Sequence, residues 1–128
     1  MRERVLIVED NKALAKLIAK KMNAHVDMDI VVTHSYAEAI EAIEENDDFF
    51  IALLDINLPD APDGEVVDYV LSKNILAIIL TGSVDENLKK LFIQKNIVDY
   101  VVKDNLDAIN YIFETINRLC RNRSYKVM

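Results

Sequence analysis

The chain has 128 residues, and its 15 basic and 22 acidic side chains give a formal net charge of −7. This length is typical of one domain with a sizeable core, and the hydrophobic share of 52% excludes a disordered chain. The excess of acidic residues argues against binding to nucleic acid or to an anionic membrane, because phosphate groups would be repelled.

Five short apolar runs alternate along the chain with segments in which apolar residues recur every three or four positions. The runs predict strands, and three of them are continuous, as in strands that are covered on both faces of a parallel sheet. The intervening spacing is typical of helices that bury one stripe. We expect the last strand at an edge, because it contains Asp99 and Tyr100. The predicted strands are Val5 to Val8, Ile30 to Thr33, Phe49 to Leu54, Leu76 to Leu80 and Val98 to Val102.

Two of the predicted helices begin with a capping signal. Ser35 with Glu38, and Ser83 with Glu86, fit the Ser-x-x-Glu pattern, in which the hydroxyl and the carboxylate bind free N–H groups of the first turn. The alternation of strands and helices predicts an α/β fold, with parallel strands joined by right-handed crossovers and helices on both faces of the sheet. Ligands bind such sheets beyond the carboxyl ends of the strands. Functional residues are therefore expected where the strands end.

Polar side chains stand at four of these strand ends. Glu9 and Asp10 follow the first strand, Asp55 the third, Thr81 the fourth and Lys103 the fifth. Carboxylates brought together in one crevice repel by a few kcal/mol per close pair at an effective dielectric of about 20, so they need a cation or a proton. Mg²⁺ prefers such oxygen ligands. Lys103 is expected to pair with Asp55 or with a phosphoryl oxygen, and Thr81 to offer a hydroxyl donor.

The few glycines, cysteines and histidines narrow the chemistry further. Two glycines cannot form a glycine-rich dinucleotide or phosphate loop, and one cysteine forms no internal disulfide. His25 and His34 are expected at the surface, away from the carboxyl ends of the strands, and Cys120 in the core. No apolar run approaches the roughly 20 residues that span a membrane, and the charged N-terminus is no signal peptide, so we expect a cytoplasmic protein.

Four short motifs end the first, third, fourth and fifth predicted strands. They are Val5-Leu6-Ile7-Val8 before Glu9-Asp10, then Leu53-Leu54-Asp55-Ile56-Asn57-Leu58-Pro59, then Leu80-Thr81-Gly82, then Tyr100-Val101-Val102-Lys103. Together, in this order and spacing, they resemble the receiver domain of bacterial two-component response regulators. The resemblance covers Arg4 to about Arg121 and implies a flavodoxin-like (βα)₅ three-layer sandwich with strand order 2-1-3-4-5. It places a receiver domain at 1–121.

The resemblance implies a metal site and a phosphoacceptor. Asp55 corresponds to the residue that accepts a phosphoryl group from a phosphohistidine. Glu9, Asp10, Asp55 and the backbone carbonyl of Asn57 correspond to the ligands of Mg²⁺. No independent enzyme activity is expected beyond self-phosphorylation from phosphodonors and autodephosphorylation.

The resemblance also implies a switch. Lys103 and Thr81 would meet the phosphoryl oxygens, and Thr81 and Tyr100 would change conformation when the group is attached. Such a change would remodel the surface of the fourth helix, the fifth strand and the fifth helix. That surface would carry the output, and a homodimer through it is left open.

Three positions depart from the pattern of the resemblance. Receivers usually have Lys-Pro with a cis bond where this chain has Lys103-Asp104, and a cis bond without proline costs about 2.5 to 4 kcal/mol, so we expect a trans bond or a strained loop. Gly64 comes one residue later than usual after Asp55, which predicts a slightly enlarged loop. Glu9 replaces a common aspartate and adds one methylene, so its bond to a metal could pass through water.

The expected partners are a sensor histidine kinase or a histidine phosphotransfer protein, and an output domain. Residues 122–128 are expected to be a linker or the start of a following domain, because Tyr125-Lys126-Val127-Met128 is similar to Glu3-Arg4-Val5-Leu6. The chain would then continue into a second receiver or another output domain. Lys103-Asp104, in place of the usual Lys-Pro, resembles the sequence at this position in receivers that are attached to cyclic-di-GMP enzymes, such as a diguanylate cyclase.

Two other functions remain as alternatives. One is a pseudo-receiver that is not phosphorylated and acts as an interaction module, although Asp55, Thr81 and Lys103 argue against it. The other is a haloacid-dehalogenase-like phosphatase on the same topology, which needs Asp-x-Asp after the first strand. Here Asp55-Ile56-Asn57 follows the third strand and has no second acid. Asp10 could also only cap the first helix.

Overall fold

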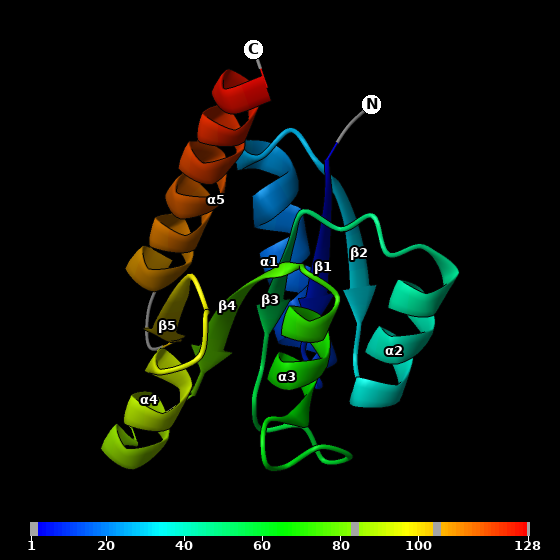
Figure 1. Ribbon diagram of the computed structural model, residues 1–128, viewed down its shortest axis with the longest axis vertical. Coiled ribbons are helices and arrows are strands. Elements are labelled where there is room, and N and C mark those ends of the chain that lie inside the picture. The colour runs from blue at the N-terminus through cyan, green and yellow to red at the C-terminus, as the bar shows by residue number, and fades with distance from the viewer. Residues whose placement is uncertain (1–2, 83–84, 104–105, 128) are drawn as a thin grey trace.

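The computed structural model describes residues 3–82, 85–103 and 106–127, and the side chains of these residues except 106 and 123–127. Strands and helices alternate along the described chain, as predicted (Figure 1). The elements are β1 (Arg4–Val8), α1 (Lys12–His25), β2 (Asp29–Thr33), α2 (Tyr36–Glu45), β3 (Ile51–Leu54), α3 (Glu65–Ser72), β4 (Leu76–Thr81), α4 (Glu86–Ile93), β5 (Asp99–Val102) and α5 (Leu106–Val127).

The strands form one parallel five-stranded sheet in the order β2-β1-β3-β4-β5. This confirms the flavodoxin-like fold, and it places β5 at an edge as expected. The predicted third strand was too long, because Phe49 and Phe50 lie before β3. Both rings are buried, and the Arg4 guanidinium lies 4.3 Å from the centroid of the Phe49 ring. The Phe50 N–H still donates to the Arg4 carbonyl at 2.9 Å, so its backbone remains bonded to β1 just before the regular strand begins.

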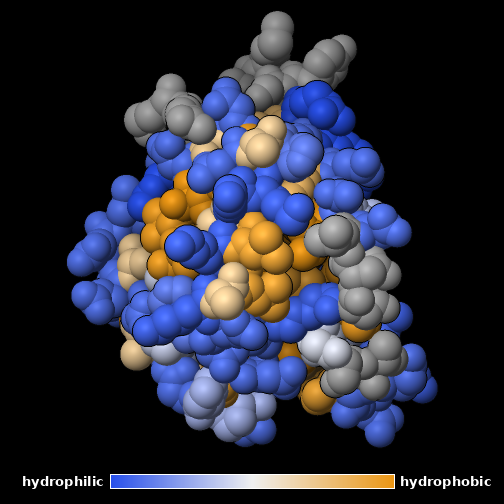
Figure 2. All heavy atoms as spheres, turned by 180° about the vertical axis from the view of Figure 1, so that it is seen from behind, coloured by the Kyte–Doolittle hydropathy of each residue, from blue (hydrophilic) through white to orange (hydrophobic). Residues whose placement is uncertain are grey.

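Apolar side chains fill the space on both faces of the sheet and make three layers. On one face, α2, α3 and α4 pack on the strands through residues such as Ile43, Val66 and Phe92. On the other face, α1 and α5 pack through residues such as Ile18, Met22 and Ile116. Seen from behind, the surface is largely hydrophilic with an apolar area near its centre (Figure 2). The continuous runs of the central strands follow from this double coverage.

The helix starts agree in part with the capping signals. Ser35 is the N-cap of α2 and accepts from the Glu38 N–H at 3.1 Å, which confirms the first predicted cap. Ser83 lies outside the described residues. The structure begins α4 at Glu86 and caps it with Asp85, whose carboxylate accepts two N–H groups, so the second predicted cap was wrong in position. Helix α1 is capped by the Asn11 side chain and not by Asp10.

Helix α5 continues to Val127, so residues 122–127 are helical in this chain. The predicted boundary after residue 121 stays a prediction. The peptide bond between Lys103 and Asp104 lies outside the described residues. Within the described ranges, every helix is too short or too polar to cross a membrane.

Candidate functional site

The sheet brings three carboxylates together at the carboxyl ends of its central strands. The Glu9 N–H donates to the Thr33 carbonyl at 3.0 Å, and the Asp55 N–H donates to the Val8 carbonyl at 2.9 Å. These bonds continue the sheet by one residue and fix where both side chains begin. One ligand oxygen from each of Glu9, Asp10 and Asp55 lies within 4.8 Å of the others. Glu9 and Asp55 are 2% and 3% exposed, whereas Asp10 is exposed.

Lys103 joins this cluster from the end of β5. Its backbone N–H donates to the Thr81 carbonyl at 2.7 Å, which holds Lys103 against β4. Its Nζ lies 2.5 Å from Glu9 Oε1 and 3.6 Å from Asp55 Oδ2. The predicted pairing of Lys103 with Asp55 is therefore the looser of the two contacts. Lys103 is bound mainly to Glu9.

The Asp55 carboxylate is held from one side by its own loop. Asp55 Oδ1 accepts from the Asn57 N–H at 2.9 Å, and this bond orients the second oxygen toward Lys103. Burial raises the pKa of Asp55 above its ordinary value, and the neighbouring Glu9 raises it further, while the Asn57 N–H and Asp10 oppose the shift. The negative charge on ionised Asp55 is therefore unfavourable in this site, and a bound cation would stabilise it.

The two predicted switch residues lie on neighbouring strands, Thr81 at the end of β4 and Tyr100 within the edge strand β5. Thr81 is 2% exposed at the end of β4. The Tyr100 ring is buried in the layer of α2, α3 and α4, and its hydroxyl has no hydrogen-bond partner of acceptable geometry among the described residues. Burial raises the pKa of Tyr100, Asp85 and Glu86 add to the shift, and Thr81 opposes it. The ring therefore points inward, toward the core and not toward solvent.

Two residues near the site were missed or misplaced from the sequence. His34 follows β2, and its Nδ1 lies 3.1 Å from the Glu9 carbonyl oxygen, so the expectation that it lies far from the strand ends was wrong. Its position directly after a predicted strand was the available signal. Asp60 accepts from the N–H groups of Tyr36 and Ala37 at 3.0 Å each, which lowers the pKa of Asp60. The loop after Asp55 is thereby tied to the start of α2.

The donor set fits a hard divalent cation. Glu9, Asp10 and Asp55 form the one group of acidic, histidine or cysteine side chains close enough to hold a metal within the described ranges. In the part of the chain that the structure describes, three carboxylates face one ammonium, that of Lys103, so the cluster keeps an excess of negative charge. Oxygen ligands with this charge suit Mg²⁺ better than a softer metal.

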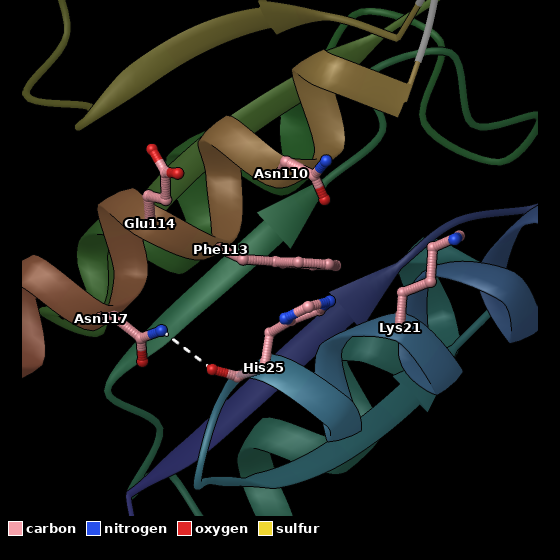
Figure 3. Close-up of a pocket in the computed structure, with 6 residues that line it drawn as sticks. All are labelled: Lys21, His25, Asn110, Phe113, Glu114 and Asn117. Atoms are coloured by element: carbon pink, nitrogen blue, oxygen red, sulfur yellow. Dashed lines mark hydrogen bonds between the residues drawn. The ribbon is translucent and has the colours of Figure 1, made fainter.

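A separate cleft lies between α1 and α5, away from the cluster (Figure 3). Its volume is about 430 Å³, and its lining includes Lys21, His25 and Phe113. The His25 and Phe113 rings are stacked with centroids 5.7 Å apart, and the His25 carbonyl accepts from the Asn117 amide at 2.9 Å. His25 thus has a packing role here, and the acid cluster is not part of this cleft.

A doubly covered parallel sheet with an acid cluster and a lysine at its carboxyl edge defines a receiver-like protein. The model of the response regulator receiver domain matches residues 5–116, and the chain belongs to this family. No curated protein matches the sequence.

Solved structures share the fold of this chain. A response regulator receiver domain protein (CheY-like) from Methanospirillum hungatei has a TM-score of 0.82 and 21% identity, with 98% of this chain and 99% of that chain covered. A DNA-binding response regulator of the LuxR family from Staphylococcus aureus has a TM-score of 0.79 and 27% identity, with 91% and 97% covered.

A third similar structure is longer than this chain. It is described as a two-component system response regulator/GGDEF domain protein, and it has a TM-score of 0.75 and 26% identity. The match covers 88% of this chain but only 45% of that protein. This chain therefore spans about half the length of that protein.

Proposed function

We propose that this chain is a phosphoacceptor receiver in which the Asp55 carboxylate accepts a phosphoryl group from a phosphohistidine. The observation that supports this most is the position of Asp55, buried at a strand end, oriented by the Asn57 N–H and facing Lys103. An Asp55 oxygen would form a bond to phosphorus as the bond from phosphorus to the histidine nitrogen breaks, and the histidine would leave with the electron pair and then take up a proton. The product is an aspartyl phosphate.

The remaining residues of the site would position and neutralise the group. Glu9, Asp10, Asp55 and the Asn57 carbonyl are the proposed ligands of Mg²⁺, which would neutralise phosphoryl oxygens when bound. Lys103 would supply a point charge to a phosphoryl oxygen, since its Nζ already lies 3.6 Å from Asp55 Oδ2. Thr81, at the end of the neighbouring strand, would donate its hydroxyl to the same group.

The attached group would act as a switch through its charge. It adds about −1.5 to −2 charges to a cluster that is already negative, so Thr81 and Lys103 would move to meet it. The Tyr100 hydroxyl lies close enough to Thr81 to oppose the rise in the pKa of Tyr100, so the ring would follow such a movement. The surface of α4, β5 and α5 would change as a result, and a homodimer through this surface is part of the proposal.

The partners follow from the same chemistry. The donor would be a sensor histidine kinase or a histidine phosphotransfer protein. The output would be a domain that follows residue 121 in a longer protein, either a second receiver or a diguanylate cyclase. The similarity to a response regulator/GGDEF domain protein supports the second choice.

The proposal is tested by incubating the chain with acetyl phosphate and Mg²⁺ and measuring the intact mass. We expect a gain of one phosphoryl group that needs Mg²⁺, is lost on treatment with hydroxylamine and is absent in Asp55→Asn. Asp48→Asn is the matched control, because Asp48 is exposed and precedes β3, whereas Asp55 follows the other end of that strand. Equal labelling of Asp55→Asn, or no labelling of the unsubstituted chain, would reject the proposal. The second outcome would favour a pseudo-receiver that acts only through contacts.

A further inference from the structure

Glu9 is fully engaged inside the acid cluster. Its Oε1 lies 2.5 Å from Lys103 Nζ, and its Oε2 accepts from the Asn11 N–H at 3.1 Å. Only 3% of the Glu9 side chain is exposed, and 15% of the Lys103 side chain. Charge-assisted bonds in such sheltered places are stronger than the same pair at the surface. Glu9 and Lys103 therefore form a firm ion pair inside the cluster.

The length of Glu9 makes this contact possible. Lys103 reaches Asp55 only at 3.6 Å, beyond normal hydrogen-bond distance, while it reaches the longer Glu9 side chain at 2.5 Å. An aspartate at position 9 would be shorter by one C–C bond of about 1.5 Å. The carboxylate would then lie well outside hydrogen-bond distance of the same Nζ. Lys103 would turn to Asp55, with which its contact is looser.

We propose that Lys103 and Mg²⁺ compete for Glu9, so that the metal must displace an internal ammonium before the site is complete. This inference rests on the proposed function and adds a regulation to it. Displacement frees Lys103 next to Asp55, so metal binding and delivery of the lysine to the phosphoryl group are one coupled event. Because the coupling is reciprocal, a Glu9–Lys103 bond that weakens metal binding is itself weakened by the metal to the same degree.

Substitutions at the two positions separate this competition from a simple ligand role. Glu9→Asp keeps the charge but loosens the bond to Lys103, so the competition predicts tighter Mg²⁺ binding, by about tenfold if one charge-assisted bond is lost. If Glu9 acts only as a direct ligand, the shorter side chain retreats from the metal and binding weakens. The two roles therefore predict opposite signs.

The experiment is a titration of Mg²⁺ by calorimetry with four proteins at one pH and ionic strength. These are the unsubstituted chain, Glu9→Asp, Lys103→Met and the double variant. We expect tighter binding in both single variants and no further gain from Glu9→Asp once Lys103 is absent. Lys95→Met is the matched control, because Lys95 pairs with Asp68 at 2.8 Å on the surface. Its Mg²⁺ affinity should equal that of the unsubstituted chain.

Equal or weaker Mg²⁺ binding by Glu9→Asp would overturn the inference, as would the same gain with and without Lys103. A second measurement keeps the result interpretable: the side-chain NMR signals of Lys103 should shift when Mg²⁺ is added to the unsubstituted chain, and an unchanged signal counts against displacement. Labelling by acetyl phosphate is scored separately. If the chain is labelled normally but the variants do not bind Mg²⁺ more tightly than the unsubstituted chain, only the competition is rejected. If the chain is not labelled, only the phosphoacceptor role is rejected.

Discussion

Replacing Asp55 by asparagine should stabilise the metal-free protein. Asp55 lies within 4.8 Å of the ligand oxygens of Glu9 and Asp10, and at an effective dielectric of about 20 each repulsion is ~3 kcal/mol. Its attraction to Lys103 at 3.6 Å is ~5 kcal/mol on the same scale. Because Asp10 is exposed, its share is smaller, so these repulsions and the attraction nearly cancel. Burial of the charge, the largest cause of the raised pKa of Asp55, then leaves a net gain of about 1 kcal/mol from Asp55→Asn. The asparagine keeps an oxygen for the Asn57 N–H.

The gain should depend on pH and on Mg²⁺ in a defined direction. The pKa of Asp55 is raised in the folded protein, so the ionised carboxylate destabilises the fold above that pKa and ceases to do so once it is protonated. The advantage of Asp55→Asn is therefore full at neutral pH and disappears as the pH falls through the raised pKa to the ordinary value. Mg²⁺ should stabilise the unsubstituted chain more than the variant.

Urea unfolding in EDTA, at neutral and at acidic pH, measures this prediction. Asp48→Asn removes an exposed acid and serves as the control for net charge. The reasoning fails if Asp55→Asn is less stable than the unsubstituted chain in EDTA. It also fails if the gain is the same at acidic pH.

Three further predictions concern single residues around the site. Gly64→Ala should destabilise the fold by about 1 to 3 kcal/mol in urea unfolding, because φ is +75° there and the added Cβ would lie 2.4 Å from Cζ of Phe92; an unchanged midpoint would contradict this. Asp60→Ala should lower the melting temperature at neutral pH, since the carboxylate binds two N–H groups at the start of α2. The lowered pKa of Asp60 means that this loss fades as the pH falls below the ordinary value, and a loss that persists in acid would show another cause. Tyr100→Phe should leave the free energy of unfolding unchanged or raise it, because the buried hydroxyl has no hydrogen bond of acceptable geometry among the described residues. A clear loss of stability in urea unfolding would contradict this, since it would mean that the hydroxyl does form a stabilising hydrogen bond.

The fold was predictable because burial on both faces leaves a strong pattern. The run from Val5 to Val8 is apolar throughout, and the structure buries all of its side chains. The ends of elements were less predictable. The buried rings of Phe49 and Phe50 extended the third run beyond the regular strand, and the start of α4 was set by Asp85 although Ser83 offered an equally good capping pattern. Local signals of similar strength compete at such ends, and tertiary contacts decide between them.

The site was predictable in its members and less so in its contacts. Parallel strands bring their carboxyl ends to one edge, so the meeting of Glu9, Asp10 and Asp55 followed from the order of the strands. The order of the strands did not predict which carboxylate Lys103 binds. That choice depends on side-chain lengths, and the distances from Lys103 Nζ to Glu9 and to Asp55 differ by only about one ångström. The tie between Asp60 and α2 joins segments far apart in the sequence, and no local pattern signals it.

The central claim is that Asp55 carries the phosphoryl group. The most direct measurement is to phosphorylate the unsubstituted chain with acetyl phosphate and Mg²⁺, to reduce the acyl phosphate with borohydride, and to locate the reduced residue by peptide mass spectrometry. The account predicts reduction at position 55 alone, with none when Mg²⁺ is withheld. Reduction at Asp10 or at another acid, or none at all, would contradict it.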